Sequence, residues 1–196
     1  MLLLFLACIQ EQSQGTSQET KRLQVESLSF PASYLVEELA GSLVTEDCVL
    51  PVGEDSVTWM PSPEKIANIQ GADLIIGNGA GFEAWVKTVS LPTSKLVLSA
   101  TGLDLIRGES STHSHGKGGD HSHGEIDPHT WASVALYKKQ AVVVSTALKK
   151  VLPEDQVLLS KNLEILQGNL DGLDLAYKKV FAPLSGLKMA ANHPSY

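Results

Sequence analysis

The chain has 196 residues, a formal net charge of −7 from 15 Lys and Arg against 22 Asp and Glu, and 43% apolar residues. This balance predicts a packed globular core and excludes a disordered acidic tail or a low-complexity chain. Its lysines occur as isolated pairs such as Lys138 and Lys139, without the clustered positive charge that a nucleic-acid surface needs. We therefore expect no nucleic-acid partner.

The N-terminal segment has the character of an export signal. Residues 2–7 read LLLFLA and precede Cys8 and a run rich in Gln and Ser. The apolar block is shorter than the ~20 residues that span a bilayer, but it fits the end of a signal peptide. A small residue before Cys8 is typical of bacterial lipoproteins, so we predict that Cys8 is lipidated; the alternative is a non-cleaved apolar N-terminus. Residues 1–22 are then a signal segment and tether, which implies a periplasmic or cell-surface lipoprotein that meets the membrane only through its anchor. Cys48, the remaining thiol, is predicted to be a small buried core residue.

The next part of the chain alternates strand-like and helical segments. Strands are predicted at 25–30, 43–51, 72–79 and 95–100, and helices at 31–40, 62–71 and 82–89. Gly41 is a stop signal for the first helix, and Ser62 is a cap for the second. The apolar runs at 72–79 and 95–100 are typical of parallel strands buried on both faces. The expected fold class is α/β, with a doubly wound parallel-sheet lobe over residues 23–150.

Two long helices are predicted to follow, the first over about 130–151 with Asp127 as its cap. The second, over 153–182, is a rod of roughly 45 Å within a linking spine at 151–184. Its leucine stripe is expected to pack along the chain's own lobe, because Gly168 and Gly172 would each cost a solitary helix about 1 kcal/mol. The run LKMAAN at 187–192 predicts one more strand. Residues 185–196 are then the incomplete start of a second α/β lobe, and we expect the chain to be a fragment.

Histidines cluster in a polar, glycine-rich loop at 108–126. The loop contains HSHG twice, which gives His113, His115, His121 and His123. Imidazole suits zinc, copper or nickel, and histidines one residue apart on a loop can converge on one ion. We predict a weak metal-capture loop; the alternative is a solvated insert without function.

Two further histidines lie at positions suited to ligands. His129 follows the predicted helix start at Asp127, where the helix dipole would keep the imidazole neutral. His193 follows a strand-like run, and open α/β sheets bind ligands beyond the carboxyl ends of their strands. The glycine-rich run at 77–81 matches a dinucleotide fingerprint only in part, so a tight strand-to-helix turn is predicted there. No hydrolase, kinase or redox motif occurs, and the chain is not expected to be an enzyme.

Three stretches together resemble the extracytoplasmic solute-binding proteins of zinc and manganese ABC importers. They are WMPSPEKIANIQGADLIIGNGAGFEAW at 59–85, DPHTW at 127–131 and NHPSY at 192–196. The resemblance covers about residues 23–196 and implies two α/β lobes joined by a rigid helix, with the metal in the cleft between them. By this resemblance His129 is the metal ligand from the first lobe and His193 the first ligand from the second.

The chain departs from the family pattern at two positions. Val57 stands where the family normally has a ligand histidine, and Met60 where it usually has Glu. Glu54 and Asp55 on the same loop are candidate substitute ligands. The expected function is capture of a divalent metal as cargo, zinc before manganese, and its delivery to an ABC permease by a monomer. The alternative is a surface-anchored adhesin or metal-storage paralog that lacks a high-affinity site.

Overall fold

The computed structural model describes residues 22–56, 58–105, 112–114, 120–122 and 126–187. Several predictions fall outside these ranges: the lipidation at Cys8, the departure at Val57, the ligand His193, the loop histidines His115 and His123, and nearly all of the strand at 187–192.

Four parallel strands form the central sheet of the fold. They are β1 (Leu23–Ser27), β2 (Val44–Cys48), β3 (Leu74–Gly77) and β4 (Leu96–Leu98), in the spatial order β2-β1-β3-β4. The register places Val25 beside Glu46 of β2 and beside Leu74 of β3. The α/β fold class with a doubly wound parallel sheet is therefore confirmed.

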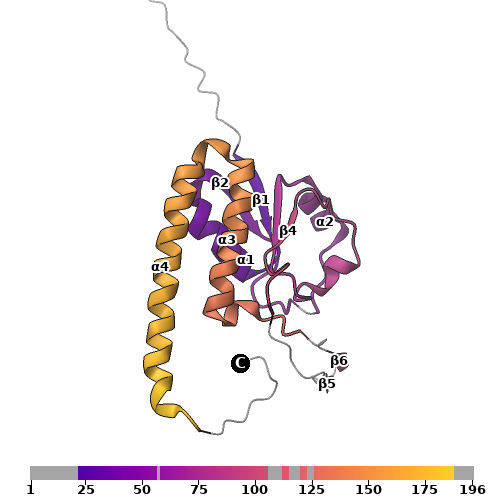
Figure 1. The fold of residues 1–196 in the computed structure, drawn as a ribbon. Helices are drawn as coiled ribbons and strands as arrows, with labels where there is room; N and C mark the ends of the chain where they lie inside the picture. Colours follow the sequence, from indigo (N-terminus) through magenta and orange to yellow (C-terminus); the bar gives the residue numbers. More distant parts are fainter. Residues whose placement is uncertain (1–21, 57, 106–111, 115–119, 123–125, 188–196) are drawn as a thin grey trace, which may run out of the picture.

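Helices cover the two faces of this sheet (Figure 1). One face packs against α1 (Phe30–Ala40), α3 (Val134–Val151) and α4 (Gln156–Phe181). The other face packs against α2 (Pro63–Gly71) and the short 3-10 helix η2 (Ala84–Lys87), which replaces the α-helix expected at 82–89. The local stop and start signals are confirmed: Gly41 follows α1 with φ 46°, and the Ser62 Oγ accepts a hydrogen bond from the Lys65 backbone N at 3.2 Å.

Burial along the strands follows their place in the sheet. All four residues of β3 are buried, as its continuous apolar run predicted for a central parallel strand. The three residues of β4 are only half-buried, so the prediction of a fully buried strand at 95–100 is wrong for its strand residues. The reason is topological, because among the strands that the structure describes β4 lies at the edge of the sheet and pairs with β3 alone.

The segment around His129 differs from the predicted helix start. Here α3 begins at Val134, after a 3-10 turn η4 (Thr130–Ala132), and its cap is Ser133, whose Oγ accepts from the Leu136 backbone N. Asp127 is therefore not the helix cap. The carbonyl oxygen of Pro128 accepts a hydrogen bond from the Asn78 side chain at 2.9 Å, which holds this segment outside the helix.

The spine helix is one continuous helix, as predicted. Along its first half Leu159, Leu166 and Leu170 are buried against α1 and α3, which confirms packing on the chain's own lobe. Toward its C-terminus α4 runs on past the ends of α1 and α3 (Figure 1), and Tyr177 and Val180 are exposed there. No helix within the described ranges has both the length and the apolar character needed to cross a bilayer.

Cys48 is half-buried at the end of β2, where it was predicted to be buried in the core. Burial raises the pKa of its thiol to about 11, while the carbonyl of Leu50 accepts a long hydrogen bond from Sγ at 3.8 Å. The side chain therefore remains a protonated thiol at neutral pH, which makes it a poor nucleophile.

A buried carboxyl group lies on the α2 side of the sheet. Glu26 in β1 is 4% exposed, and its Oε2 lies 3.9 Å from the Nζ of Lys65, which bonds Asp47 at 2.5 Å. Burial raises the pKa of Glu26 and outweighs the opposing effect of Lys65. The folded protein thus holds a proton on Glu26 at a pH where the unfolded chain has lost it.

This raised pKa predicts a pH-dependent contribution to stability. Between the usual pKa of a glutamate and the raised pKa of Glu26, the folded state binds more protons than the unfolded state, so the free energy of unfolding falls as pH rises. We expect Glu26→Gln to remove this part of the slope, measured as urea midpoints from about pH 4, near the usual pKa of a glutamate, to about pH 8. Glu164→Gln, at an exposed position of α4, is the control; identical slopes in the wild type and Glu26→Gln would contradict the prediction.

Candidate metal site

His129 lies beyond the carboxyl ends of the strands, in an aromatic setting. Its ring stands edge-on to Phe82 and Trp131, with centroid distances of 5.9 Å and 5.4 Å. Its side chain is 26% exposed and that of Asp127 is 13% exposed. The imidazole is thus packed on its sides by two large rings and still reaches solvent.

Asp127 fixes the orientation and tautomer of this imidazole. Its Oδ1 lies 2.9 Å from the His129 Nδ1 and also accepts a hydrogen bond from the His129 backbone N at 2.9 Å. An ionised carboxylate can only accept, so Nδ1 carries the hydrogen and the neutral ring has its lone pair on Nε2. A carboxylate behind one ring nitrogen is the usual support for a histidine whose other nitrogen binds a metal. The sequence prediction placed His129 at a helix N-terminus, whereas in the structure a 3-10 turn follows the histidine and the Asp127 carboxylate contacts its ring.

The segment containing His129 is attached to the sheet beside its topological switch point. The chain leaves β1 toward α1 on one face and leaves β3 toward η2 on the other, so the direction of the connections reverses between these two strands. Ser29 follows β1, and Asn78 follows β3 and bonds the Pro128 carbonyl. Open α/β sheets bind ligands at this position.

The glycine-rich run after β3 is a tight turn, as predicted. Gly79, Ala80 and Gly81 all have positive φ angles, 81°, 55° and 85°, and a Cβ on Gly79 would lie 3.0 Å from that of Leu98. The buried Glu83 carboxylate accepts from the backbone N of Asn78 at 2.7 Å and of Gly79 at 3.0 Å. These N–H groups are the kind that bind phosphate in a dinucleotide fold, and here a carboxylate occupies them.

The substitute ligands Glu54 and Asp55 are both exposed on the loop between β2 and α2. Among the described residues no group of three or more His, Cys, Asp or Glu side chains is arranged to hold a metal. A closed zinc site takes four ligands. The described ranges therefore contain one oriented histidine and no complete ligand set for zinc.

The histidine-rich segment contains two short strands rather than loop alone. Here β5 (Thr112–Ser114) pairs with β6 (Asp120–Ser122) in antiparallel fashion. The register sets His113 opposite His121. The histidine-rich segment was predicted as a loop, and its described residues form this pair of strands.

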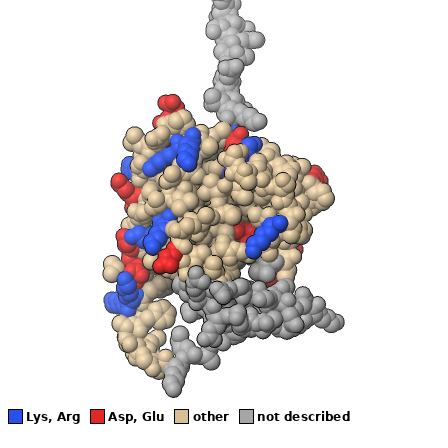
Figure 2. All heavy atoms as spheres, turned by 45° about the vertical axis from the view of Figure 1, so that its right-hand side comes forward, with Lys and Arg blue, Asp and Glu red and all other residues tan. Residues whose placement is uncertain are grey.

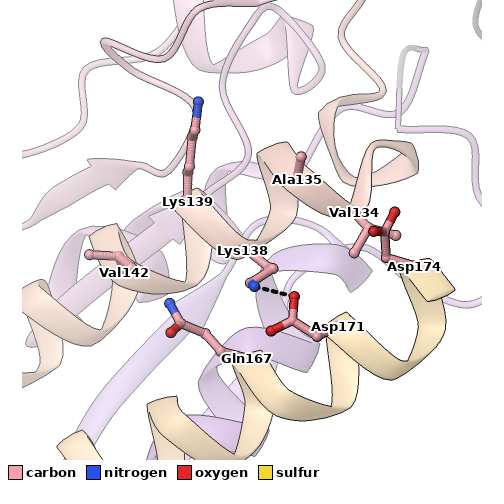
Figure 3. A pocket seen from close by; sticks show the side chains of 8 residues that line it. All are labelled: Val134, Ala135, Lys138, Lys139, Val142, Gln167, Asp171 and Asp174. Atoms are coloured by element: carbon pink, nitrogen blue, oxygen red, sulfur yellow. Dashed lines mark hydrogen bonds and ion pairs between the residues drawn. The ribbon is translucent and has the colours of Figure 1, made fainter.

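A separate hollow of about 400 Å³ lies between α3 and α4 (Figure 3). Lys138 of α3 pairs with Asp171 of α4 across it. No histidine or cysteine lines it, and Lys138 already neutralises one of its two acids. The hollow is thus a gap between two helices that an ion pair bridges. Its lining residues are Val134, Ala135, Lys138, Lys139, Val142, Gln167, Asp171 and Asp174.

Charged side chains are dispersed on the face drawn in Figure 2. Lysines stand apart from one another there, and several have acidic neighbours. Two ion pairs involve α4: Lys138 of α3 with Asp171, and Lys178 with Asp174, the latter with Nζ 2.6 Å from Oδ2. This described surface carries a mixture of both signs.

Sequence reasoning missed the residues that support His129. Asp127 was interpreted as a helix cap, although the spacing Asp-x-His is also compatible with a carboxylate that turns back to the ring. Glu83 was noted only as one residue of the stretch 59–85 that carries the family resemblance. Asn78, Thr130 and Gln140 were not singled out, because the hydrogen bonds of Asn78 to this region join residues 50 or more positions apart.

Comparison with known proteins identifies relatives in metal uptake. The family model "Zinc-uptake complex component A periplasmic" matches residues 29–196. The high-affinity zinc uptake system protein ZnuA of Bacillus subtilis is 26% identical over 200 residues, which cover 99% of this chain and 63% of that protein. The manganese ABC transporter substrate-binding lipoprotein scaA of Streptococcus gordonii is 26% identical over 192 residues, covering 92% of this chain and 59% of that one.

Solved structures agree with these relatives. A zinc-bound deletion mutant of ZnuA superimposes with a TM-score of 0.75 at 25% identity, covering 89% of this chain and 64% of that chain. The metal-dependent lipoprotein YcdH of Bacillus subtilis gives a TM-score of 0.67 at 25% identity, covering 81% and 55%. The chain spans about three fifths of the length of these proteins. The match to the family model covers most of the chain, and the chain belongs to the family of periplasmic zinc-uptake complex component A.

Proposed function

We propose that this chain captures a divalent metal ion, zinc in the first place, outside the cytoplasm and delivers it to an ABC-type permease. The observation that carries the proposal is His129, whose ring is held by Asp127 so that Nε2 carries the lone pair at the ligand-binding edge of the sheet. Its family consists of uptake components rather than enzymes, and its relatives are named for zinc and for manganese. The location outside the cytoplasm agrees with relatives named periplasmic proteins and lipoproteins.

The preference for zinc over manganese rests on the donor atom. An imidazole nitrogen binds zinc more strongly than manganese, which prefers carboxylate, carbonyl and water oxygens. We propose that His193 supplies a second imidazole and that Glu54 or Asp55 substitutes for the missing ligand at Val57. The loop histidines His113, His115, His121 and His123 are proposed to capture zinc weakly before it reaches this site.

For the organisation of the chain we propose four parts. Residues 1–22 are the signal segment with Cys8 as the lipid attachment, and residues 23–150 are the metal-binding lobe. The linking helix region is 151–184, and 185–196 begins a second lobe. The exposed apolar side chains of the C-terminal part of α4, such as Tyr177 and Val180, support this division, since they offer a surface to further chain.

The test is a zinc titration by competition with a chelator. In a background with the four loop histidines changed to alanine, we expect His129→Ala to weaken zinc binding at least tenfold, about 1.4 kcal/mol, because one nitrogen ligand is replaced by water. His193→Ala should act similarly. Manganese in the same titration should bind more weakly than zinc.

Glu164→Ala, an exposed change on α4, is the control and should leave the affinity unchanged. If both His129→Ala and His193→Ala are silent while zinc still binds, the proposed site is wrong. A chain that binds no zinc at all in this background would favour the interaction-protein alternative.

A further inference from the structure

A buried amide at the end of β3 has all of its hydrogen-bonding groups engaged. The Asn78 side chain is 1% exposed. Its Nδ2 donates to the carbonyls of Pro128 at 2.9 Å and Gly79 at 3.0 Å, and its Oδ1 accepts from the Thr130 hydroxyl at 2.6 Å and the Gln140 Nε2 at 2.9 Å. A side-chain amide has two donor hydrogens and two acceptor lone pairs, so none is left over.

Two of these four bonds flank His129 in the sequence. Pro128 is bound through its carbonyl oxygen and Thr130 through its hydroxyl, so one side chain fixes the backbone immediately before and after the histidine. The Thr130 hydroxyl lies closer to the Asn78 Oδ1, at 2.6 Å, than to its other acceptor, the Gln140 Oε1, at 3.1 Å. Asn78 is therefore the principal partner of this segment.

The network also joins the segment to the rest of the fold. Gln140 of α3 donates from Nε2 both to Asn78 and, at 2.8 Å, to the Ser99 hydroxyl just after β4. Asn78, Ser99, Thr130 and Gln140 are each at most 2% exposed. Hydrogen bonds in such a dry setting are strong, and a fully satisfied network makes its members rigid.

Asn78 is itself held by Glu83. The Oε1 of Glu83 accepts from the Asn78 backbone N, and the same oxygen accepts from the Ser29 hydroxyl at 2.8 Å. The turn therefore fixes the backbone from which the amide projects. Hydrogen bonds at the ends of β1 and β3 therefore hold Asn78 in place, and Asn78 in turn holds the segment that contains His129.

We propose that Asn78 is a positioning residue for metal binding, which holds the His129 segment so that its ring is presented to the ion without reorganisation. The inference rests on the proposed function, because it takes His129 to be a ligand. A ligand fixed before the metal arrives loses less conformational entropy on binding, and this increases affinity. Changes in residues that support metal ligands typically alter affinity by about 10–100-fold.

The chemistry of the site requires asparagine at this position. Aspartate would retain both acceptor bonds but lose the donor to Pro128, and it would set a buried carboxylate against that carbonyl oxygen. An apolar residue of similar size would remove the oxygen that accepts from Thr130 and Gln140, and it would leave the carbonyls of Pro128 and Gly79 without the Nδ2 donor. Only a group that donates and accepts twice satisfies all four partners.

The first measurement is zinc affinity in the full chain with the four loop histidines changed to alanine. We expect Asn78→Ala to weaken zinc binding by about 10–100-fold. Ile75→Ala is the matched control: Ile75 is a fully buried neighbour in β3 that packs against the α2 side, so it perturbs the core without touching the network. Its zinc affinity should stay within twofold of the wild type. Thr130→Val, which removes one hydroxyl and keeps the shape, is the milder variant if Asn78→Ala does not fold.

The second measurement shows whether Asn78 acts through His129. If it does, Asn78→Ala should weaken zinc binding in the presence of His129 but have no further effect in the His129→Ala background. Equal losses in both backgrounds would overturn the proposal. So would an Asn78→Ala affinity no weaker than that of Ile75→Ala.

The third measurement does not involve metal and separates this proposal from the proposed function. Backbone order parameters of the His129, Thr130 and Trp131 amides should fall in metal-free Asn78→Ala and stay unchanged in Ile75→Ala. Unchanged order in Asn78→Ala would overturn the positioning role even if His129 binds zinc. If instead His129→Ala leaves zinc affinity unchanged, the proposed function fails, and the order parameters still report whether Asn78 holds the segment.

Discussion

Replacing Glu83 with alanine should lower the free energy of unfolding by about 3 kcal/mol or more, because each buried donor left without a partner costs about 1–3 kcal/mol. Three donors lose their acceptor: the backbone N–H groups of Asn78 and Gly79 and the hydroxyl of Ser29. Glu83 is 4% exposed, so water does not readily replace the carboxylate. Urea unfolding followed by tryptophan fluorescence measures the effect, since Trp85 is buried nearby in η2.

Glu83→Gln is the informative companion to this variant. Its oxygen can keep the bonds to Asn78 and Ser29, whereas its amide nitrogen would face the Gly79 N–H, so the loss should be smaller than for alanine. Glu164→Ala on the exposed side of α4 should change stability by no more than about 0.5 kcal/mol. A Glu83→Ala protein as stable as this control would contradict the buried hydrogen bonds described for the turn.

Leu166→Ala in the spine helix is expected to cost about 2–5 kcal/mol, the usual range for a buried leucine. Leu166 is 1% exposed and lies in the core formed with α1 and α3. Leu175→Ala, nine positions along the same helix at a residue that is 66% exposed, should change stability by no more than about 0.5 kcal/mol. The urea midpoint of each variant is compared with that of the wild type, and the dependence of the free energy of unfolding on urea concentration should be the same in all three proteins.

Leu166 tests the part of α4 that packs against α1 and α3, and Leu175 tests the exposed C-terminal part of the same helix. Small effects at both positions would show that α4 does not contribute to the core of the sheet domain. A large effect at Leu175 would show that the C-terminal part of the helix packs against chain outside the described ranges.

Signals that act over a few residues were sufficient for much of the fold. The Ser62 cap, the glycine stop at Gly41 and the apolar run of β3 each depend on neighbouring residues, and each element is present where it was predicted. The order of strands and helices followed from their alternation, since parallel strands need crossovers. Burial of β4 could not be derived this way, because it depends on which strand becomes the edge.

The candidate site was predictable only at its histidine. His129 was identified from its motif, but its support comes from contacts that sequence spacing does not reveal. Asn78 and Gln140 are 62 positions apart, and Asn78 and Thr130 are 52 apart. Asp127 is two positions from His129 and contacts its ring, yet the same spacing suits a helix cap. The Asn78 bond to Pro128, which the sequence does not reveal, holds this segment outside the helix.

The turn that holds Asn78 also affects the chemical lifetime of the protein. An Asn-Gly sequence is prone to deamidation, in which the backbone nitrogen of the glycine attacks the side-chain carbonyl carbon, closes a succinimide ring and expels ammonia. Here the Gly79 N–H is bound to Glu83 at 3.0 Å, and the Asn78 amide is held by four partners that prevent its rotation toward that nitrogen. Unfolding breaks the Gly79 bond to Glu83 and the bonds of the Asn78 amide together. The rate of deamidation at Asn78 is therefore expected to follow the fraction of unfolded protein, because the folded turn protects this Asn-Gly sequence.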